Sequence, residues 1–170
     1  QVIPSPSGSY SPKIFDDFMN LLNFKNDSDQ RLLLECYIIS LFIPRISKAI
    51  LMLHGPEGAA KSACERIIKL LVDPTSGDLM KLRLREDDIV LQLANNYIVY
   101  YDNARDLPDW ASDLFCIAAT GGTYSKRMLY FDNQEMTFPL SNPIGFNGIN
   151  LAASSPDILD RGLNIELEKI

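Results

Sequence analysis

The sequence predicts an α/β fold, in which a five-stranded parallel sheet is flanked by helices, preceded by a short helical segment and interrupted by a β-hairpin. Three observations favour this fold class. The chain has 170 residues, of which 46% are hydrophobic and 22% charged, as in one globular domain with a continuous core. Short apolar runs alternate with amphipathic stretches, as in parallel strands joined by right-handed crossovers. A glycine-containing loop follows the first apolar run, where such folds bind phosphate groups.

The first part of the chain is expected to hold a linker and two helices. Residues 1–12 contain three prolines, four serines and a glycine, which favour an extended linker. Residues 13–48 are expected to form an N-terminal helical segment, because apolar residues recur at helical spacing in Lys13–Phe24 and Asp29–Phe42. Pro44 ends the second helix, since proline cannot donate a helical hydrogen bond.

Residues 49–170 are expected to form the α/β core. The strands are predicted from short apolar runs, at Ala49–Leu53, Lys81–Arg85, Tyr97–Tyr101, Pro143–Phe146 and Leu163–Leu167. Helices are predicted between them, at Ala60–Val72, Asp87–Asn95 and Leu107–Thr120. After Gly121 and Gly122, a hairpin is expected through Tyr124–Leu129 and Glu135–Phe138.

Composition excludes several classes of function. No run reaches the roughly 18 apolar residues that a membrane span needs, and the start at Gln1 has no signal-peptide pattern, so no membrane partner is expected. The three cysteines, Cys36, Cys64 and Cys116, are dispersed and odd in number, which excludes a disulfide framework or zinc cluster and favours a cytoplasmic protein. The net charge of −6 means that nucleic acid would need a local basic patch. The first residue is not methionine, so we expect a piece of a longer protein.

The segment after the first strand predicts a phosphate-binding loop. It reads Gly55-Pro-Glu-Gly-Ala-Ala60-Lys61-Ser62 and matches GxxxxGK[ST], except that Ala60 replaces the second glycine. Lys61 would contact the β- and γ-phosphates of ATP, Ser62 would coordinate Mg²⁺, and the following helix N-terminus would attract the phosphates. A turn that merely caps a helix is the alternative, but the flanking strand and helix favour nucleotide binding. The residues expected to contact ATP are Gly55, Pro56, Glu57, Gly58, Ala59, Ala60, Lys61, Ser62 and Ala63.

Asp102 is the second expected site residue. It ends the apolar run Tyr97–Tyr101, so a buried strand would bring its carboxylate to the edge of the sheet beside Mg²⁺. A turn at the strand end is the alternative role. The next residue is Asn103, which cannot accept a proton from the attacking water as a glutamate can. The sequence therefore supports nucleotide binding more strongly than hydrolysis. His54, the only histidine, is expected to pack at the strand end without a catalytic role.

A set of motifs in fixed order resembles the ATPase segment of bacterial, phage and mobile-element primase-helicase proteins. The motifs are HGPEGAAKSACERIIKLLVDP, YDNARDLPDWASDLFCIAATGG with KRMLYFD, PIGFNGI, and PDILDRGLNIEL. The likeness covers the chain from about Ile14 onward. That group is a branch of the AAA+ fold of P-loop NTPases, related to superfamily 3 and minichromosome-maintenance helicases. Its members also carry Asp-Asn after the second motif strand, so Asn103 is typical of them.

The resemblance implies catalytic roles for two further residues. Asn147 stands where sensor 1 is expected, an amide that orients the attacking water near the γ-phosphate. A strand-end turn is its alternative. Arg161 resembles the arginine finger, which acts on the ATP of a neighbour in a homo-oligomeric ring. A surface salt bridge with Asp157 or Asp160 is the alternative for Arg161.

The resemblance also implies a nucleic-acid contact. Lys126 and Arg127 lie in the expected hairpin, where related helicases place a basic loop in the ring channel. They would contact single-stranded DNA, and a solvated charge pair is the alternative. The helical lid that follows the core in related proteins is expected to be absent from this chain, which stops at Ile170.

Two functions stay open at this point. The first is an ATP-hydrolysing AAA+ core of a primase-helicase type protein in DNA replication, with ATP and Mg²⁺ as cofactors and Lys61, Asp102, Asn147 and Arg161 as catalytic residues. The alternative is a nucleotide-switched assembly module with little or no hydrolysis. Ala60 and Asn103 favour the nucleotide-switched module. Asn147 together with Arg161 favours the ATP-hydrolysing core, or motor, which is the preferred interpretation.

Overall fold

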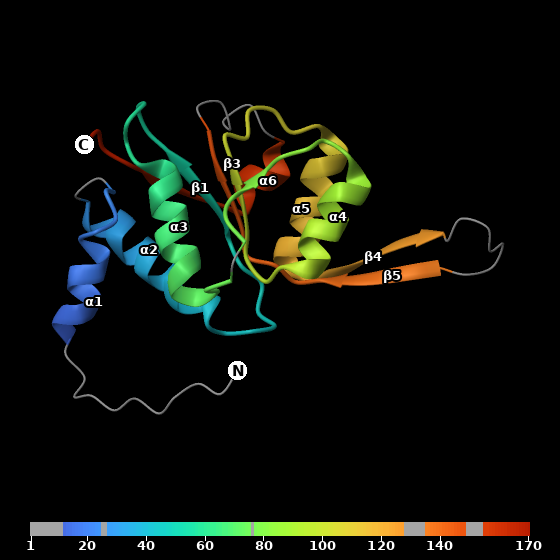
Figure 1. Cartoon of the computed structure of the whole chain (residues 1–170), viewed down its shortest axis with the longest axis horizontal. Coiled ribbons are helices and arrows are strands. Elements are labelled where there is room, and N and C mark those ends of the chain that lie inside the picture. Colours follow the sequence, from blue (N-terminus) through green and yellow to red (C-terminus); the bar gives the residue numbers. More distant parts are fainter. Residues whose placement is uncertain (1–11, 25–26, 76, 128–134, 149–154) are drawn as a thin grey trace.

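The computed structural model describes residues 12–24, 27–75, 77–127, 135–148 and 155–170. The expected linker up to residue 11 and residues 128–129 of the expected hairpin lie outside these described residues. Within them, a sheet lies between two groups of helices, which gives three layers (Figure 1). The predicted α/β class is confirmed.

Five strands form the main sheet, as predicted. They are β1 (Ile50–His54), β2 (Met80–Lys81), β3 (Val99–Asp102), β6 (Ile144–Asn147) and β7 (Gly162–Glu166). Their order is β2-β3-β6-β1-β7, and every neighbouring pair is parallel. Because β6 lies between β1 and β3, the carboxyl ends of these three strands share one edge of the sheet. Open α/β sheets bind ligands at such an edge.

The described residues also form six helices and the expected hairpin. The helices are α1 (Pro12–Met19), α2 (Ser28–Leu41), α3 (Lys61–Val72), α4 (Glu86–Asn95), α5 (Asp109–Thr120) and α6 (Pro156–Asp160). Strands β4 (Gly122–Arg127) and β5 (Glu135–Leu140) pair antiparallel in a separate two-stranded sheet. Figure 1 shows this hairpin extending away from the main sheet, past α4 and α5.

Alternate residues of the strands bury opposite faces of the sheet. On β1, Leu51 and Leu53 pack with α1, α2 and α3, whereas Ile50 packs with α4, α5 and α6. On β3, Tyr100 faces the first group of helices and Tyr101 the second. Burial of each large apolar side chain of this kind contributes about 1.5–3 kcal/mol to the free energy that stabilises the fold. Burial on both faces explains why the central strands are continuous apolar runs in the sequence.

The N-terminal helices share a core with α3 and the sheet. Asp27 caps α2, because its side chain accepts a hydrogen bond from the N–H of Asp29 at 2.9 Å. The hydroxyl groups of Tyr37 on α2 and Tyr100 on β3 lie 3.1 Å apart. Burial raises the pKa of both phenols, so both stay neutral hydrogen-bonding groups. The expected boundary after residue 48, between an N-terminal helical segment and the α/β core, stays a prediction.

Some element boundaries differ from the expected ones. Helix α1 ends at Met19 and not at Phe24, because the chain turns and Phe24 bridges to Leu167 beside the sheet. Strand β2 has only two residues in place of the expected Lys81–Arg85, since its pairing with β3 is confined to them. Helix α6, which was not predicted, has five residues, too few for apolar periodicity to reveal a helix.

Candidate functional site

Three strand ends meet at one edge of the sheet. The register pairs Leu53 of β1 with Asn147 of β6, and Tyr101 of β3 with Phe146 of β6. A cavity of about 420 Å³ opens at this edge. It is lined by Glu57, Gly58, Ala59, Ala60, Lys61, Ser62, Ala63, Asp102, Asn103, Arg105, Asn147 and Gly148. The structure therefore brings together the predicted phosphate-binding loop, Asp102 and Asn147, which are far apart in the sequence.

The phosphate-binding loop connects β1 to α3. Gly55, with φ 144°, has no room for a side chain, because a Cβ atom there would lie 2.3 Å from the carbonyl oxygen of Leu167. The Lys61 ammonium lies over the loop, where it donates to the carbonyl oxygens of Gly55 at 3.0 Å and Pro56 at 2.8 Å. Gly55 and Pro56 thus contact the lysine without lining the cavity.

Ala60 shows why glycine is usual at its place in the motif. It adopts a left-handed backbone conformation, with φ 57° and ψ 30°, so α3 begins at Lys61, one residue later than expected. This conformation costs a residue with a Cβ atom roughly 1–2 kcal/mol. The loop therefore keeps the left-handed conformation that glycine would adopt without strain. The alanine in its place lowers the stability of the fold.

Ala60→Gly is expected to stabilise the protein. Relief of the left-handed strain exceeds the roughly 0.5–1 kcal/mol lost through the greater freedom of glycine in the unfolded chain. A net gain of about 0.5–1 kcal/mol should raise the melting temperature by about 1–4 °C, measured by thermal unfolding. The matched control is Ala63→Gly, an exposed position in the first turn of α3, which should lose about 0.5–1 kcal/mol. Equal losses in both variants would contradict the assignment of strain to Ala60.

Ser62 and Asp102 form an oxygen pair suited to Mg²⁺. The Ser62 hydroxyl at the start of α3 donates to Oδ1 of Asp102 at the end of β3, at 2.7 Å. Both residues are partly buried. Mg²⁺ in proteins is usually held by one or two carboxylates together with phosphate oxygens and water. The donor set therefore fits the predicted metal.

Asn147 connects β6 to the other two elements of the site. Its Oδ1 accepts a hydrogen bond from the N–H of Asn103 at 2.8 Å, and its carbonyl oxygen accepts one from Ala104 at 2.9 Å. Asn103 has a left-handed backbone with φ 57°, which asparagine tolerates better than most residues. Gly148 is also required by packing, since a Cβ atom there would lie 2.2 Å from the carbonyl oxygen of Ala104. The strand end and the loop after Asp102 thus fix each other.

Sequence reasoning missed two charged residues at the site. Arg105 lines the cavity, and its place three residues after Asp102 in a loop at the carboxyl edge was an available signal. Glu65 on α3 has no exposed surface, and its Oε2 accepts a hydrogen bond from Nδ2 of Asn147 at 2.6 Å. Burial raises the pKa of Glu65 well above its usual range. In the sequence, Glu65 stands four residues after Lys61 and four before Lys69, a spacing typical of a solvated helix face.

Arg161 lies directly after α6 and away from the cavity lining. Its Nη1 donates to the carbonyl oxygen of Asp157 at 2.9 Å and lies 3.7 Å from Asp157 Oδ1. The side chain of Arg161 is 40% exposed. Within one chain, the guanidinium therefore makes the weak surface salt bridge that was the alternative to the arginine finger.

The two expected DNA-contacting residues lie on the hairpin. Lys126 on β4 forms an ion pair with Asp87 on α4. Arg127 ends β4 opposite Glu135, and its side chain lies outside the part of the chain that the structure describes. The hairpin and the cavity are built from different elements.

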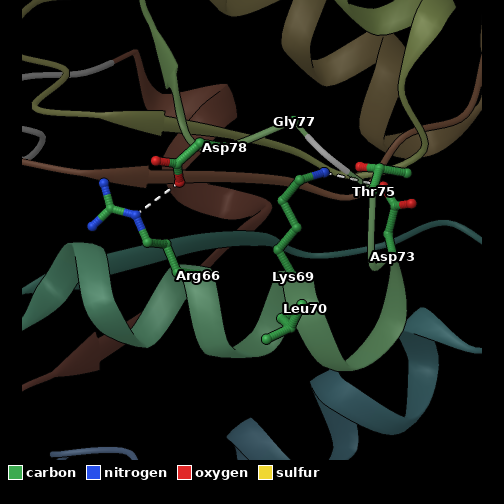
Figure 2. A pocket seen from close by; sticks show the side chains of 7 residues that line it. All are labelled: Arg66, Lys69, Leu70, Asp73, Thr75, Gly77 and Asp78. Atoms are coloured by element: carbon green, nitrogen blue, oxygen red, sulfur yellow. Dashed lines mark hydrogen bonds and ion pairs between the residues drawn. The ribbon is translucent and has the colours of Figure 1, made fainter.

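A second pocket, of about 260 Å³, lies beside α3 and next to the segment that follows it (Figure 2). Arg66 and Asp78 point toward each other there and form a 2.7 Å ion pair. Lys69 pairs with Asp73 at 3.1 Å. Both cations of this pocket thus already have a carboxylate partner. The pocket is a poorer phosphate site than the cavity at the sheet edge.

Three further observations concern other kinds of site. His54 ends β1 with an exposed side chain, so the expectation that it packs at the strand end was wrong. Among the described residues, no group of three or more His, Cys, Asp or Glu side chains is placed to hold a metal ion. No helix in this part of the chain has the length and apolar character needed to cross a membrane.

Comparison with known proteins identifies the family. The model of a family described as actinomycete integrative conjugative element replication protein matches residues 15–170. No curated protein sequence matches the chain. The apo structure of the NrS-1 C-terminal region (305–718) is similar, with a TM-score of 0.57, 14% identity, and coverage of 97% of this chain and 42% of that one. A JCV helicase structure has a TM-score of 0.52, 10% identity, and coverage of 98% and 48%.

These matches confirm the fold and the resemblance read from the motifs. At such low identities the solved structures establish the fold alone, and the chain spans less than half the length of either of them. The sheet order and the loop after β1 agree with a P-loop domain of the AAA+ type. The family match covers nearly the whole sequence. The chain belongs to the family of actinomycete integrative conjugative element replication proteins.

Proposed function

We propose that this chain binds ATP with Mg²⁺ and hydrolyses it, as the AAA+ core of a primase-helicase type protein in DNA replication. One observation carries the proposal: the hydroxyl of Ser62 in the phosphate-binding loop contacts the carboxylate of Asp102 at 2.7 Å. In P-loop NTPases, such a hydroxyl and such a strand-end acid hold Mg²⁺ beside the β- and γ-phosphates. The replication family supports the biological setting.

The residues of the cavity have separate tasks in the proposed reaction. The N–H groups at the start of α3 attract the phosphates. Lys61 exchanges its bonds to the carbonyl oxygens of Gly55 and Pro56 for stronger bonds to charged phosphate oxygens. Ser62 and Asp102 would hold Mg²⁺, which would supply positive charge beside the phosphates. Asn147 orients the attacking water.

The proposed hydrolysis requires a second subunit. Arg161 does not line the cavity of its own chain and has an exposed guanidinium. In a homo-oligomeric ring it would reach the ATP of a neighbour. Lys126 and Arg127 lie on a hairpin that extends from the domain, and there they would contact the phosphates of single-stranded DNA. The ammonium group of Lys126 would then leave its ion pair with Asp87 and pair with a phosphate of the DNA.

A nucleotide-switched assembly module is the second candidate, and Asn103 favours it. This residue stands where many AAA+ enzymes carry a glutamate base, and its left-handed backbone suits asparagine. Turnover by the longer parent protein separates the two candidates. ATP hydrolysis that single-stranded DNA accelerates supports the motor, whereas tight ATP binding without turnover supports the switch.

Asp102→Asn is expected to weaken ATP binding in the presence of Mg²⁺ by about tenfold, or roughly 1.4 kcal/mol. Binding in the presence of a chelator should change by less than about twofold, because the carboxylate acts through the metal. The asparagine oxygen still accepts the Ser62 hydroxyl, so the fold should persist. Nucleotide titration with a fluorescent ATP analogue, with and without Mg²⁺, measures both affinities.

The matched control for this measurement is Asp106→Asn, which removes an exposed acid from the same loop outside the cavity. Its affinity should stay within about twofold of wild type under both conditions, since exposed charges are screened. An equal loss for Asp102→Asn with and without Mg²⁺ would show that Asp102 is only structural.

A further inference from the structure

Glu65 is a buried acid that the proposed chemistry does not use. It lies on α3, one turn after Lys61, and has no exposed surface. Its Oε2 accepts a hydrogen bond from Asn147 Nδ2 at 2.6 Å, while its buried Oε1 has no hydrogen-bond partner among the residues that the structure describes. Burial of a carboxyl oxygen without a hydrogen-bond partner lowers the stability of the fold, so a function served by this residue would explain its presence.

The surroundings of Glu65 connect it to the nucleotide site. The Nδ2 atom of Asn147 also lies 3.5 Å from Oγ of Ser62, and its Oδ1 accepts a hydrogen bond from the N–H of Asn103. Burial raises the pKa of Glu65 and the charge of Asp102 adds to this effect, while the hydrogen bond from Asn147 and the charge of Arg66 oppose it. Glu65 itself does not line the cavity. It is therefore placed to act on the site through Asn147 and not on a bound nucleotide.

We propose that Glu65 is a positioning residue, which holds the Asn147 amide in the orientation needed to read the γ-phosphate. An amide group can rotate by half a turn with little change in shape, which exchanges its donor for its acceptor. The Asn103 N–H requires Oδ1 on one side, and on the other side Nδ2 donates to Oε2 of Glu65. Together they allow one orientation, with Nδ2 directed toward Ser62. This inference rests on the proposed function, because it assigns Asn147 to ATP.

The nucleotide preference of variants tests this role. Glu65→Leu keeps the volume of the side chain and removes the acceptor, so the Asn147 amide loses one of its two anchors. We expect the preference for a non-hydrolysable ATP analogue over ADP, measured by calorimetry, to fall by about tenfold while ADP affinity stays within about twofold. Glu65→Gln retains an acceptor oxygen and should keep the preference.

A double-mutant comparison shows whether Glu65 acts through Asn147. Asn147→Ala should lose the same preference, and adding Glu65→Leu to it should cost nothing further. The matched control is Lys69→Met, one turn later on the same helix and also buried, where it contacts Asp73 and the carbonyl oxygen of Ile98. This variant should lower the melting temperature and leave the preference unchanged.

Nuclear magnetic resonance of the protein without nucleotide separates this inference from the proposed function. The side-chain amide signals of Asn147 should move in Glu65→Leu and stay close to wild type in Glu65→Gln. Unmoved signals, unchanged preference in Glu65→Leu, or additive losses in the double variant would each overturn the positioning role while the proposed function stands. A wild-type protein that binds neither nucleotide would overturn the proposed function, and the inference with it.

Discussion

Lys61→Ala is expected to reduce ATP affinity by at least about a hundredfold and to leave the fold intact. In the proposed complex, the ammonium makes two charge-assisted hydrogen bonds to phosphate oxygens, each contributing about 1.5–3 kcal/mol. Their joint loss of roughly 3 kcal/mol corresponds to about two orders of magnitude in affinity. In the protein alone, the hydrogen bonds of Nζ within the described part of the chain go to two carbonyl oxygens of a partly exposed loop. The melting temperature should therefore stay within about 2 °C of wild type.

The matched control is Lys81→Ala, which removes the same charge from an exposed position on β2, outside the cavity. Its ATP affinity should remain within about twofold of wild type, because distant surface charges are screened at physiological ionic strength. Calorimetric titration measures both variants, and circular dichroism reports their folding. A folded Lys61→Ala protein that binds ATP as tightly as wild type would remove the basis for the phosphate-binding loop.

The sheet could be predicted from sequence because its strands are buried on both faces. Residues Ile50–Leu53 form a continuous apolar run for this reason, and the glycine-containing loop after the run fixes the first strand–helix unit. The insertion of β6 between β1 and β3 could not be predicted from the same pattern. Strand order depends on pairing between residues far apart in the chain, which local periodicity does not encode.

The candidate site was predicted where its residues occupy motif positions, and its buried acid, Glu65, was missed. Lys61, Ser62 and Asp102 occupy motif positions, so their types and spacing point to phosphate and metal. Glu65 occupies no motif position, and an acid four residues after a lysine is typical of a solvated helix face. Only the fold shows that Asn147 arrives beside it. Buried polar partners of this kind depend on tertiary packing, and a single sequence gives no sign of them.

Arg161→Ala is expected to reduce ATP turnover by the longer parent protein by a factor on the order of a thousand, with ATP affinity nearly unchanged. The reason is electrostatic. Negative charge on the γ-phosphate oxygens must be stabilised during transfer, and an arginine supplied by a neighbour does so only in the transition state. The salt bridge to Asp157 is exposed and so contributes little to stability. The variant should thus fold and bind ATP as the wild type does.

Mixing two inactive variants tests whether Arg161 acts between subunits. Arg161→Ala subunits keep an intact Lys61, and Lys61→Ala subunits keep an intact Arg161, so some interfaces in mixed rings contain both groups. Turnover should partly return in the mixture, because at those interfaces one subunit binds ATP and its neighbour supplies the guanidinium. Arg161→Lys serves as a control for charge alone, since a lysine lacks the planar fork that contacts two phosphate oxygens. If mixed oligomers form and stay as inactive as either variant, Arg161 does not act on a neighbour, and the salt bridge with Asp157 becomes the better account of this residue.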